Sequence, residues 1–254
     1  MTFSVTDAIA VAAIAFFAAL AQGATGFGFA IIPLPLLLGV MGSLDAVGLT
    51  IILNLLVSLV LVPGLWRQAP KPPLIRLSVG SMIGFPIGLV VFLNASLDWV
   101  RLAVGLIILL FAGWLSLSHR RMNSDRGPAS PRGWAEIPVG MISGAMATAL
   151  AMPGPSVMLY LSASGMAKAP LRATTLCLFT LSYAAALALQ AAAGAIDAGI
   201  WKIVVLAAGP TAVGAVAGHR LSGRLGEGLF RTIVLAILLV TGAYTTVTAI
   251  GHWL

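Results

Sequence analysis

Charged side chains are scarce in this sequence of 254 residues. Asp, Glu, Lys and Arg make up 8% of it, against roughly 25% in an ordinary soluble domain, and hydrophobic residues make up 60%. A soluble domain of this length needs far more polar side chains to cover its surface. The composition therefore excludes a soluble enzyme and a disordered protein. The one cysteine, Cys177, excludes an intrachain disulfide and a multi-cysteine metal site.

Ionisable side chains are also nearly absent from the interiors of the apolar runs. The carboxylates Asp7, Asp45, Asp98, Asp197 and Glu227 sit at predicted loop or helix-end positions. No paired carboxylates, metal-ligand spacing or Ser/His/Asp set occurs at depth, so we expect no enzyme, no metal and no cofactor. Because a cation site in a membrane usually supplies acidic side chains or many carbonyl oxygens, a cation or metal permease is disfavoured.

The net charge of +7 does not indicate nucleic-acid binding, because Lys and Arg lie in short loops between apolar runs. The N-terminal segment carries Asp7 and no basic region, so it does not predict a cleaved signal peptide. What the sequence does contain is a series of apolar blocks. They are residues 4–41, 46–63, 74–93, 100–117, 134–165, 170–193, 201–219 and 228–250.

Two of these blocks, 4–41 and 134–165, are too long for one straight crossing, which needs about 20 residues. Glycine or proline interrupts each of them, in Gln22–Gly28 and in Met152–Pro155. Each block is therefore either a broken helix that crosses once or a hairpin that returns to its starting side.

The positive-inside rule favours hairpins. If both blocks cross once, Lys and Arg divide 8 to 6 between the two sides; if both return, they divide 12 to 2. The larger group is Arg67, Lys71, Arg76, Arg120, Arg121, Arg126, Arg132, Lys168, Arg172, Arg220, Arg224 and Arg231, against Arg101 and Lys202. We therefore expect eight to ten helical segments, both termini outside and a cytoplasmic linker over 118–133. Whether each hairpin is re-entrant or two full spans stays open.

The two halves of the sequence resemble each other. A shift of 126 residues places Gly28 on Gly154, and a shift of 130 places Gly84 on Gly214. Each half contains a broken block and then three plain helices, and with returning hairpins the second half is inverted relative to the first. We predict an all-α integral membrane protein of two inverted repeats, 1–117 and 134–254, which is an arrangement typical of secondary transporters.

The interrupted segments are the predicted binding site, because unwound backbone at membrane depth must line a cavity or be buried in protein. A helix N-terminus offers free N–H groups and partial positive charge, which suits an anion. By contrast, Gly80, Gly84 and Gly88 are interpreted as helix-packing positions. The predicted substrate-binding residues are Gln22, Gly23, Thr25, Gly26, Phe27, Gly28, Asn54, Gly154, Pro155, Ser156 and Tyr160.

Several polar residues have two interpretations. Asn54, Thr180 and Gln190 lie inside apolar helices, where an unbonded polar group is costly. Each is interpreted either as a site residue or as a group that forms hydrogen bonds between helices. Tyr160 is either a ligand contact or a packed aromatic residue. Arg172 is interpreted as an anchor at the membrane surface in preference to an anion ligand.

The interrupted segments carry a family resemblance. Gln22–Leu38 (QGATGFGFAIIPLPLLL) and Gly144–Leu161 (GAMATALAMPGPSVMLYL) resemble the two signatures of the sulfite exporter family, TauE/SafE type. The resemblance implies a bacterial inner-membrane permease for sulfite, organosulfonates such as sulfoacetate, or carboxylates. Ala151, Met152 and Pro153 precede Gly154 where that family is often richer in glycine, so the two half-sites need not be equivalent. The residues to which the family's function carries over are Gly23, Gly26, Gly28, Pro33, Gly154, Pro155 and Tyr160.

Taken together, these patterns predict a carrier that works by alternating access, as a monomer or homodimer in the lipid bilayer. Uniport, proton symport and antiport remain open, as does the direction of transport. An anion channel or a carboxylate permease on the same scaffold, and a membrane accessory protein without a substrate, are the alternatives.

Overall fold

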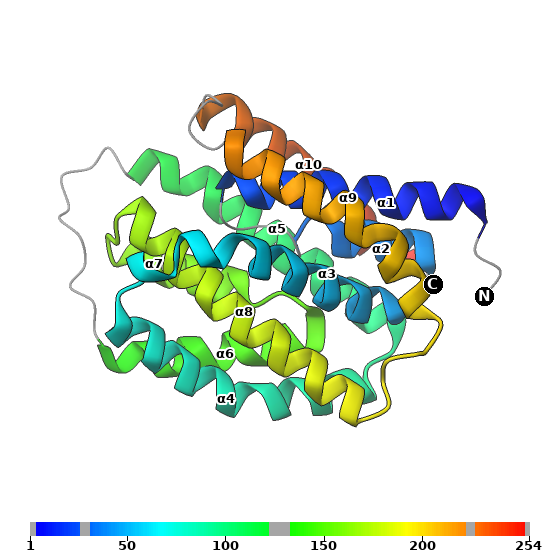
Figure 1. Cartoon of the computed structure of the whole chain (residues 1–254), viewed down its shortest axis with the longest axis horizontal. Helices are drawn as coiled ribbons and strands as arrows, with labels where there is room; N and C mark the ends of the chain where they lie inside the picture. Colours follow the sequence, from blue (N-terminus) through cyan, green and yellow to red (C-terminus); the bar gives the residue numbers. More distant parts are fainter. Residues whose placement is uncertain (1–3, 26–30, 122–132, 222–226, 252–254) are drawn as a thin grey trace.

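The computed structural model describes residues 4–25, 31–121, 133–221 and 227–251, and every regular element within those ranges is helical (Figure 1). Three short 3-10 turns, η1 (Val62–Gly64), η2 (Trp66–Gln68) and η3 (Gly133–Ala135), accompany the α-helices. The α-helices are α1 (Val5–Thr25), α2 (Pro33–Met41), α3 (Asp45–Leu61), α4 (Lys71–Asn94), α5 (Leu97–Arg121), α6 (Glu136–Leu150), α7 (Gly154–Ala163), α8 (Lys168–Ala192), α9 (Ile200–Leu221) and α10 (Glu227–Gly251).

The predicted fold class, an all-helical membrane protein, is confirmed. Within the part of the chain that the structure describes, six helices (α1, α3, α4, α5, α8 and α9) are long and apolar enough to cross a membrane. Each long block of the sequence becomes two helices, α1 with α2 and α6 with α7, and each shorter block becomes one. The predicted linker, 118–133, falls mostly outside the described residues, between the end of α5 and η3.

Helices α2 and α7 are too short to span a bilayer. They contain 9 and 10 residues, which corresponds to about 15 Å, or half of a hydrocarbon core of about 30 Å. Proline in the first turn, Pro33 in α2 and Pro155 in α7, is compatible with a helix start because the missing N–H is not needed there. Gly42, in the left-handed conformation, ends α2.

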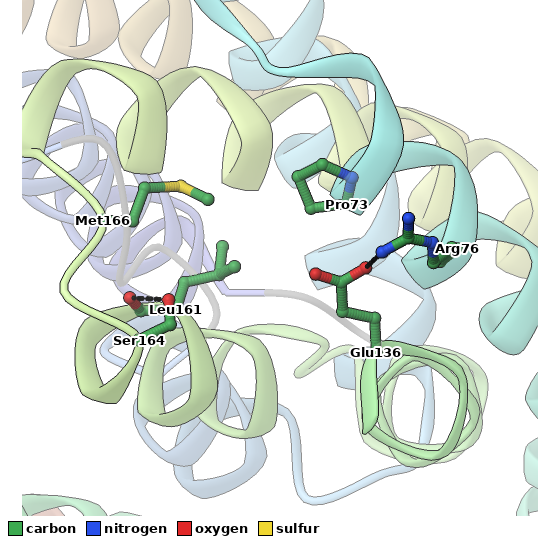
Figure 2. Close-up of a pocket in the computed structure, with 6 residues that line it drawn as sticks. All are labelled: Pro73, Arg76, Glu136, Leu161, Ser164 and Met166. Carbon is green, nitrogen blue, oxygen red and sulfur yellow. Dashed lines mark hydrogen bonds and ion pairs between the residues drawn. The ribbon is translucent and has the colours of Figure 1, made fainter. Parts of the chain in front are cut away.

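The hairpin of α6 and α7 returns to the side on which it begins. Glu136 at the start of α6 and Leu161 near the end of α7 line the same cavity, together with Pro73 and Arg76 from the start of α4 (Figure 2). We call this end of the bundle the linker end; it is defined by the starts of α4, α6 and α8. Arg172 near the start of α8 contacts His219 near the end of α9, so α9 ends there too.

Helices α3 and α8 occupy the middle of the bundle, between the α1–α9 pair and the α4–α6 pair (Figure 1). The buried share of their apolar windows is 61% and 44%, against 28–33% for the other four spanning helices. Large hydrophobic residues that are exposed for contact with lipid lie mainly on the outer helices.

The α4–α6 pair is held by glycine. A Cβ added to Gly80, Gly84 or Gly88 of α4 would collide with the backbone of α6, at Ile137, Met141 and Ala145 in turn. Gly140 and Gly144 of α6 meet the α4 backbone in the same way. The predicted packing role of the three α4 glycines is confirmed. Because the contacts advance together along both helices, α4 and α6 run parallel.

Three other pairs define the remaining directions. Gly214 and Gly218 of α9 meet the backbone of Phe16 and Leu20 of α1, so α1 and α9 are also parallel. Gly48 near the start of α3 lies beside Gln190 near the end of α8, so these helices are antiparallel. Gly105 of α5 faces Thr246 of α10, and Gly242 faces Ile108 and Leu109, so this pair is antiparallel as well.

The glycine contacts predict that Gly84→Ala destabilises the protein. The added methyl group must push α4 away from the Met141 carbonyl, and such overpacking costs about 1–3 kcal/mol of unfolding free energy. Gly209→Ala on α9 is the matched control, because nothing lies within 4 Å of its new methyl group. Thermal unfolding in detergent micelles checks this prediction, and equal melting temperatures for the two variants would contradict it.

Candidate functional site

The interruption between α6 and α7 is a tightly bonded turn. Ala151 adopts the left-handed conformation at φ 54°, and its N–H donates to the carbonyl of Ala147 at 3.0 Å. The N–H of Met152 donates to the carbonyl of Met146 at 3.1 Å. These bonds end α6 in the manner of a Schellman cap, although alanine stands where glycine is usual.

Side chains supply donors for further carbonyls of this turn. Gln190 Nε2 on α8 donates to the carbonyl of Thr148 at 2.8 Å, and the Tyr183 hydroxyl on α8 donates to that of Ala151 at 3.3 Å. From α6, Ser143 Oγ donates to the carbonyl of Pro153 at 2.8 Å. All three donor side chains are buried. Each bond occupies one of the two lone pairs of a carbonyl oxygen that could otherwise coordinate a cation.

Helix α7 begins at this turn, inside the protein. Its N-cap, Pro153, makes no side-chain capping bond, and Gly154 and Pro155 are buried. A Cβ on Gly154 would come within 3.1 Å of the Phe179 ring on α8. The Ser156 hydroxyl oxygen is buried and has no hydrogen-bond partner among the described residues. The start of α7 thus offers backbone and hydroxyl donors, together with the partial positive charge of a helix N-terminus.

The first interruption is described up to the end of α1. The side chain of Gln22 is fully buried, and both of its amide atoms lack a partner within the described part of the chain. Gly23 packs against the α9 backbone at Ala215, and its carbonyl accepts a hydrogen bond from Arg172 Nη2 at 2.6 Å. The other predicted residues of this segment, Gly26, Phe27 and Gly28, lie outside the residues that the structure describes, and so does the side chain of Thr25.

Arginine side chains donate hydrogen bonds to carbonyl groups near the ends of α1 and α2, the two helices of the first hairpin. Arg172, interpreted from the sequence as an anchor at the membrane surface, donates to the Gly23 carbonyl of α1 and contacts His219 Nδ1 at 3.2 Å. Arg101 of α5 donates to the carbonyl of Leu38 in α2 at 3.3 Å and pairs with Asp98 at 3.3 Å. The Gly23 carbonyl is one of the last four of α1, which have no partner within that helix, whereas the Leu38 carbonyl also accepts a hydrogen bond from the N–H of Gly42 at 3.1 Å.

The two interruptions approach the same helix. Arg172 contacts Gly23 beside the first, and Phe179 lies against Gly154 at the second. Seven residues of an α-helix rise by about 10 Å, so the two contacts are about two turns apart along α8. The structure therefore brings the described parts of both predicted half-sites to the first half of α8.

The four remaining predicted polar residues differ in their surroundings. Thr180 bonds its own helix, through Oγ1 to the Leu176 carbonyl at 2.9 Å, whereas Gln190 is an interhelical hydrogen-bonding group. Asn54 is fully buried on α3 with its Oδ1 unpartnered among described groups. Tyr160 is partly buried against Leu77 and its neighbours, about two turns of α7 beyond Gly154.

A cavity of about 250 Å³ at the linker end was not anticipated from the sequence (Figure 2). One wall carries an ion pair between Arg76 and Glu136, 2.9 Å apart, and the other carries Leu161, Ser164 and Met166. The Glu136 side chain is only 4% exposed. The partners are 60 positions apart in the sequence, and no local pattern pairs them. Leu161 is about 10 Å along α7 from Gly154, so this cavity is separate from the interruption.

These features define a class of protein. It is a multi-pass helical membrane protein whose two interrupted hairpins meet at a central helix, and no group of three or more potential metal ligands occurs in its described residues. The sequence model of the family described as sulfite exporter TauE/SafE matches residues 11–245. The chain belongs to this family, whose members are membrane exporters of small anions and not enzymes. Comparison with curated proteins and with solved structures gives no match.

The bonded turn predicts that Ser143→Ala destabilises the protein. The change leaves the buried carbonyl of Pro153 without its donor, which costs about 1–3 kcal/mol of unfolding free energy. Ser116→Ala is the control, because its exposed hydroxyl bonds only its own helix, at the Ala112 carbonyl. Melting temperatures in detergent test the difference. A Ser143→Ala protein as stable as Ser116→Ala would contradict it.

Proposed function

We propose that this protein is a secondary transporter for a small sulfur-containing oxyanion, sulfite or an organosulfonate such as sulfoacetate, and that it works by alternating access. Family membership supports a small anion as the substrate. The observation that supports the location of the site is that both interruptions lie against α8. There the start of α7 offers hydrogen-bond donors, whereas the neighbouring carbonyl groups already accept hydrogen bonds from side chains.

In this proposal the two halves are inverted repeats. The order of elements supports it, since a hairpin with one short helix and then three long helices occur in each half. The counterpart helices α3 and α8 run in opposite directions, and so do α5 and α10. The pairs that join the halves agree with this. In the repeat, α4 corresponds to α9 and α6 corresponds to α1, so the parallel pair α4–α6 corresponds to the parallel pair α9–α1. Rocking of one part against the other would then expose the site to each side in turn.

The proposed site consists of the predicted residues at both interruptions, from Gln22 to Gly28 and from Gly154 to Ser156, with Asn54 and Tyr160. The protein would lie in the bacterial inner membrane with both termini periplasmic, because this orientation places the basic linker end in the cytoplasm. Proton coupling is one of the schemes for the carrier, alongside uniport and antiport, and the protein would act as a monomer or homodimer.

Tracer counterflow in proteoliposomes tests the proposed function. Vesicles are preloaded with unlabelled sulfite and then given labelled sulfite outside. A carrier accumulates the label transiently above equilibrium, whereas a channel does not. Unitary currents in a planar bilayer would favour the channel. Absence of both exchange and anion-dependent thermal stabilisation would favour an accessory protein, because a specific ligand stabilises the folded state.

Gly154→Leu is expected to abolish this exchange in a folded protein. The larger side chain must enter the space held by the Phe179 ring and cover the backbone at the start of α7. Gly113→Leu on the exposed face of α5, where nothing lies within 4 Å of an added Cβ, is the matched control. Normal exchange by Gly154→Leu would exclude the second interruption from the site.

A further inference from the structure

Buried hydroxyl groups in this bundle usually bond their own helix. The hydroxyl of a buried Ser or Thr reaches the carbonyl four residues earlier, as in Thr50 to Ala46, Thr175 to Leu171 and Thr211 to Ala207, at 2.6–2.7 Å. Ser58 on α3 and Ser182 on α8 do not follow this pattern. Both side chains are fully buried, and neither hydroxyl oxygen has a partner within the ranges that the structure describes.

These two serines lie at one level of the bundle. Gly48 of α3 lies beside Gln190 of the antiparallel α8. From that contact, Ser182 is about 12 Å back along α8, and Ser58 is about 15 Å forward along α3. Asn54, about 9 Å forward, lies on the same face of α3 as Ser58, because residues four apart are neighbours on a helix surface.

The level is also that of the second interruption. Ser182 is three residues beyond Phe179, the residue against Gly154, which is a separation of about 5 Å along α8. The unpartnered groups of the two central helices therefore lie close in height to the start of α7. All three side chains are fully buried, so surface water does not reach them.

The orientation of the Asn54 amide is fixed by its partner. Asn54 Nδ2 donates to the carbonyl of Thr50 at 2.9 Å, and a carbonyl can only accept, so the nitrogen must face it. The oxygen Oδ1 is then the free end, and it is buried without a donor among described groups. A ligand that reached all three groups would meet two hydroxyls that can donate and one amide oxygen that can only accept.

We propose that Ser58 and Ser182 donate hydrogen bonds to the transported oxyanion and that Asn54 Oδ1 accepts one from it, which for sulfite requires the protonated form, hydrogensulfite. The site would then prefer small anions that carry an O–H or N–H group of their own over anions that carry none. This inference rests on the proposed transport function and extends its site to residues of the two central helices.

The physical basis is the high cost of burying a polar group without a partner. Fully buried hydroxyl and amide groups of this kind are retained where something outside the chain satisfies them. A water cluster would do so without regard to the anion. If the groups instead bind the substrate, the protein folds without them but binds the anion more weakly.

Alanine variants separate the two cases. Ser58→Ala and Ser182→Ala are expected to melt at or above the wild-type temperature without ligand, because each removes an unsatisfied group. Each should raise the KM for sulfite counterflow by about tenfold or more, since a hydrogen bond to a charged group is lost. Both should also reduce the thermal stabilisation by sulfite. Thr211→Ala, which loses a bond to its own helix only, should leave KM unchanged.

The acceptor role has its own test. The hydroxylated anion 2-hydroxyethanesulfonate should inhibit sulfite counterflow about tenfold more strongly than ethanesulfonate. Asn54→Leu should bring this ratio close to one, and Asn54→Ser is a smaller second variant if that protein does not fold. Asn94→Leu is the matched control, because exposed Asn94 bonds its own helix in the same way, at the Val90 carbonyl.

Failures of the two proposals are distinguishable. If wild-type protein exchanges sulfite while both serine variants keep the wild-type KM, or melt lower with KM unchanged, the serine assignment is overturned and the transport function stands. Equal inhibition by the two sulfonates, or a ratio that persists in the Asn54 variants, overturns the acceptor role. Wild-type protein that neither exchanges nor is stabilised by sulfite overturns the proposed function and this assignment with it.

Discussion

The architecture depends on one constraint: inside hydrocarbon, no water is present to satisfy a free backbone group. A helix can be interrupted at membrane depth only where the protein supplies the missing partners or where the interruption lines a cavity. Ser143, Tyr183 and Gln190 do this at the second interruption, and Arg172 does it at the end of α1. Because three of these four side chains belong to α8, the interruptions fix α8 in the centre of the bundle.

The same constraint determines the chemistry of the interior. The partners supplied at the second interruption are donors, and they are used on carbonyl oxygens. What remains unused there is the start of a helix, with its N–H groups and partial positive charge. An interior organised in this way favours negative charge without containing a lysine or arginine at the interruption itself, and this agrees with membership of a family of anion exporters.

Much of the fold is predictable from the sequence because hydropathy and glycine spacing are local properties. The position of each interruption, the helices and the packing of Gly84 all follow from short patterns. The roles of polar side chains do not. Thr180 and Ser182 stand two residues apart in the same apolar helix, yet only Thr180 bonds its own backbone, because neighbouring helices decide where each hydroxyl faces. The ion pair of Arg76 with Glu136 joins distant segments and leaves no local signal.

The helix pairs that pack through glycine have an evolutionary consequence. Helix α4 belongs to the first half of the chain and its partner α6 to the second, and α1 and α9 likewise come from opposite halves. Either half alone would leave glycine-lined backbone against lipid, where it packs poorly. Under the proposed inverted repeat, an ancestor of half this length would have needed a second copy inserted in the opposite orientation, and fusion of the two through a linker would have made that pairing permanent.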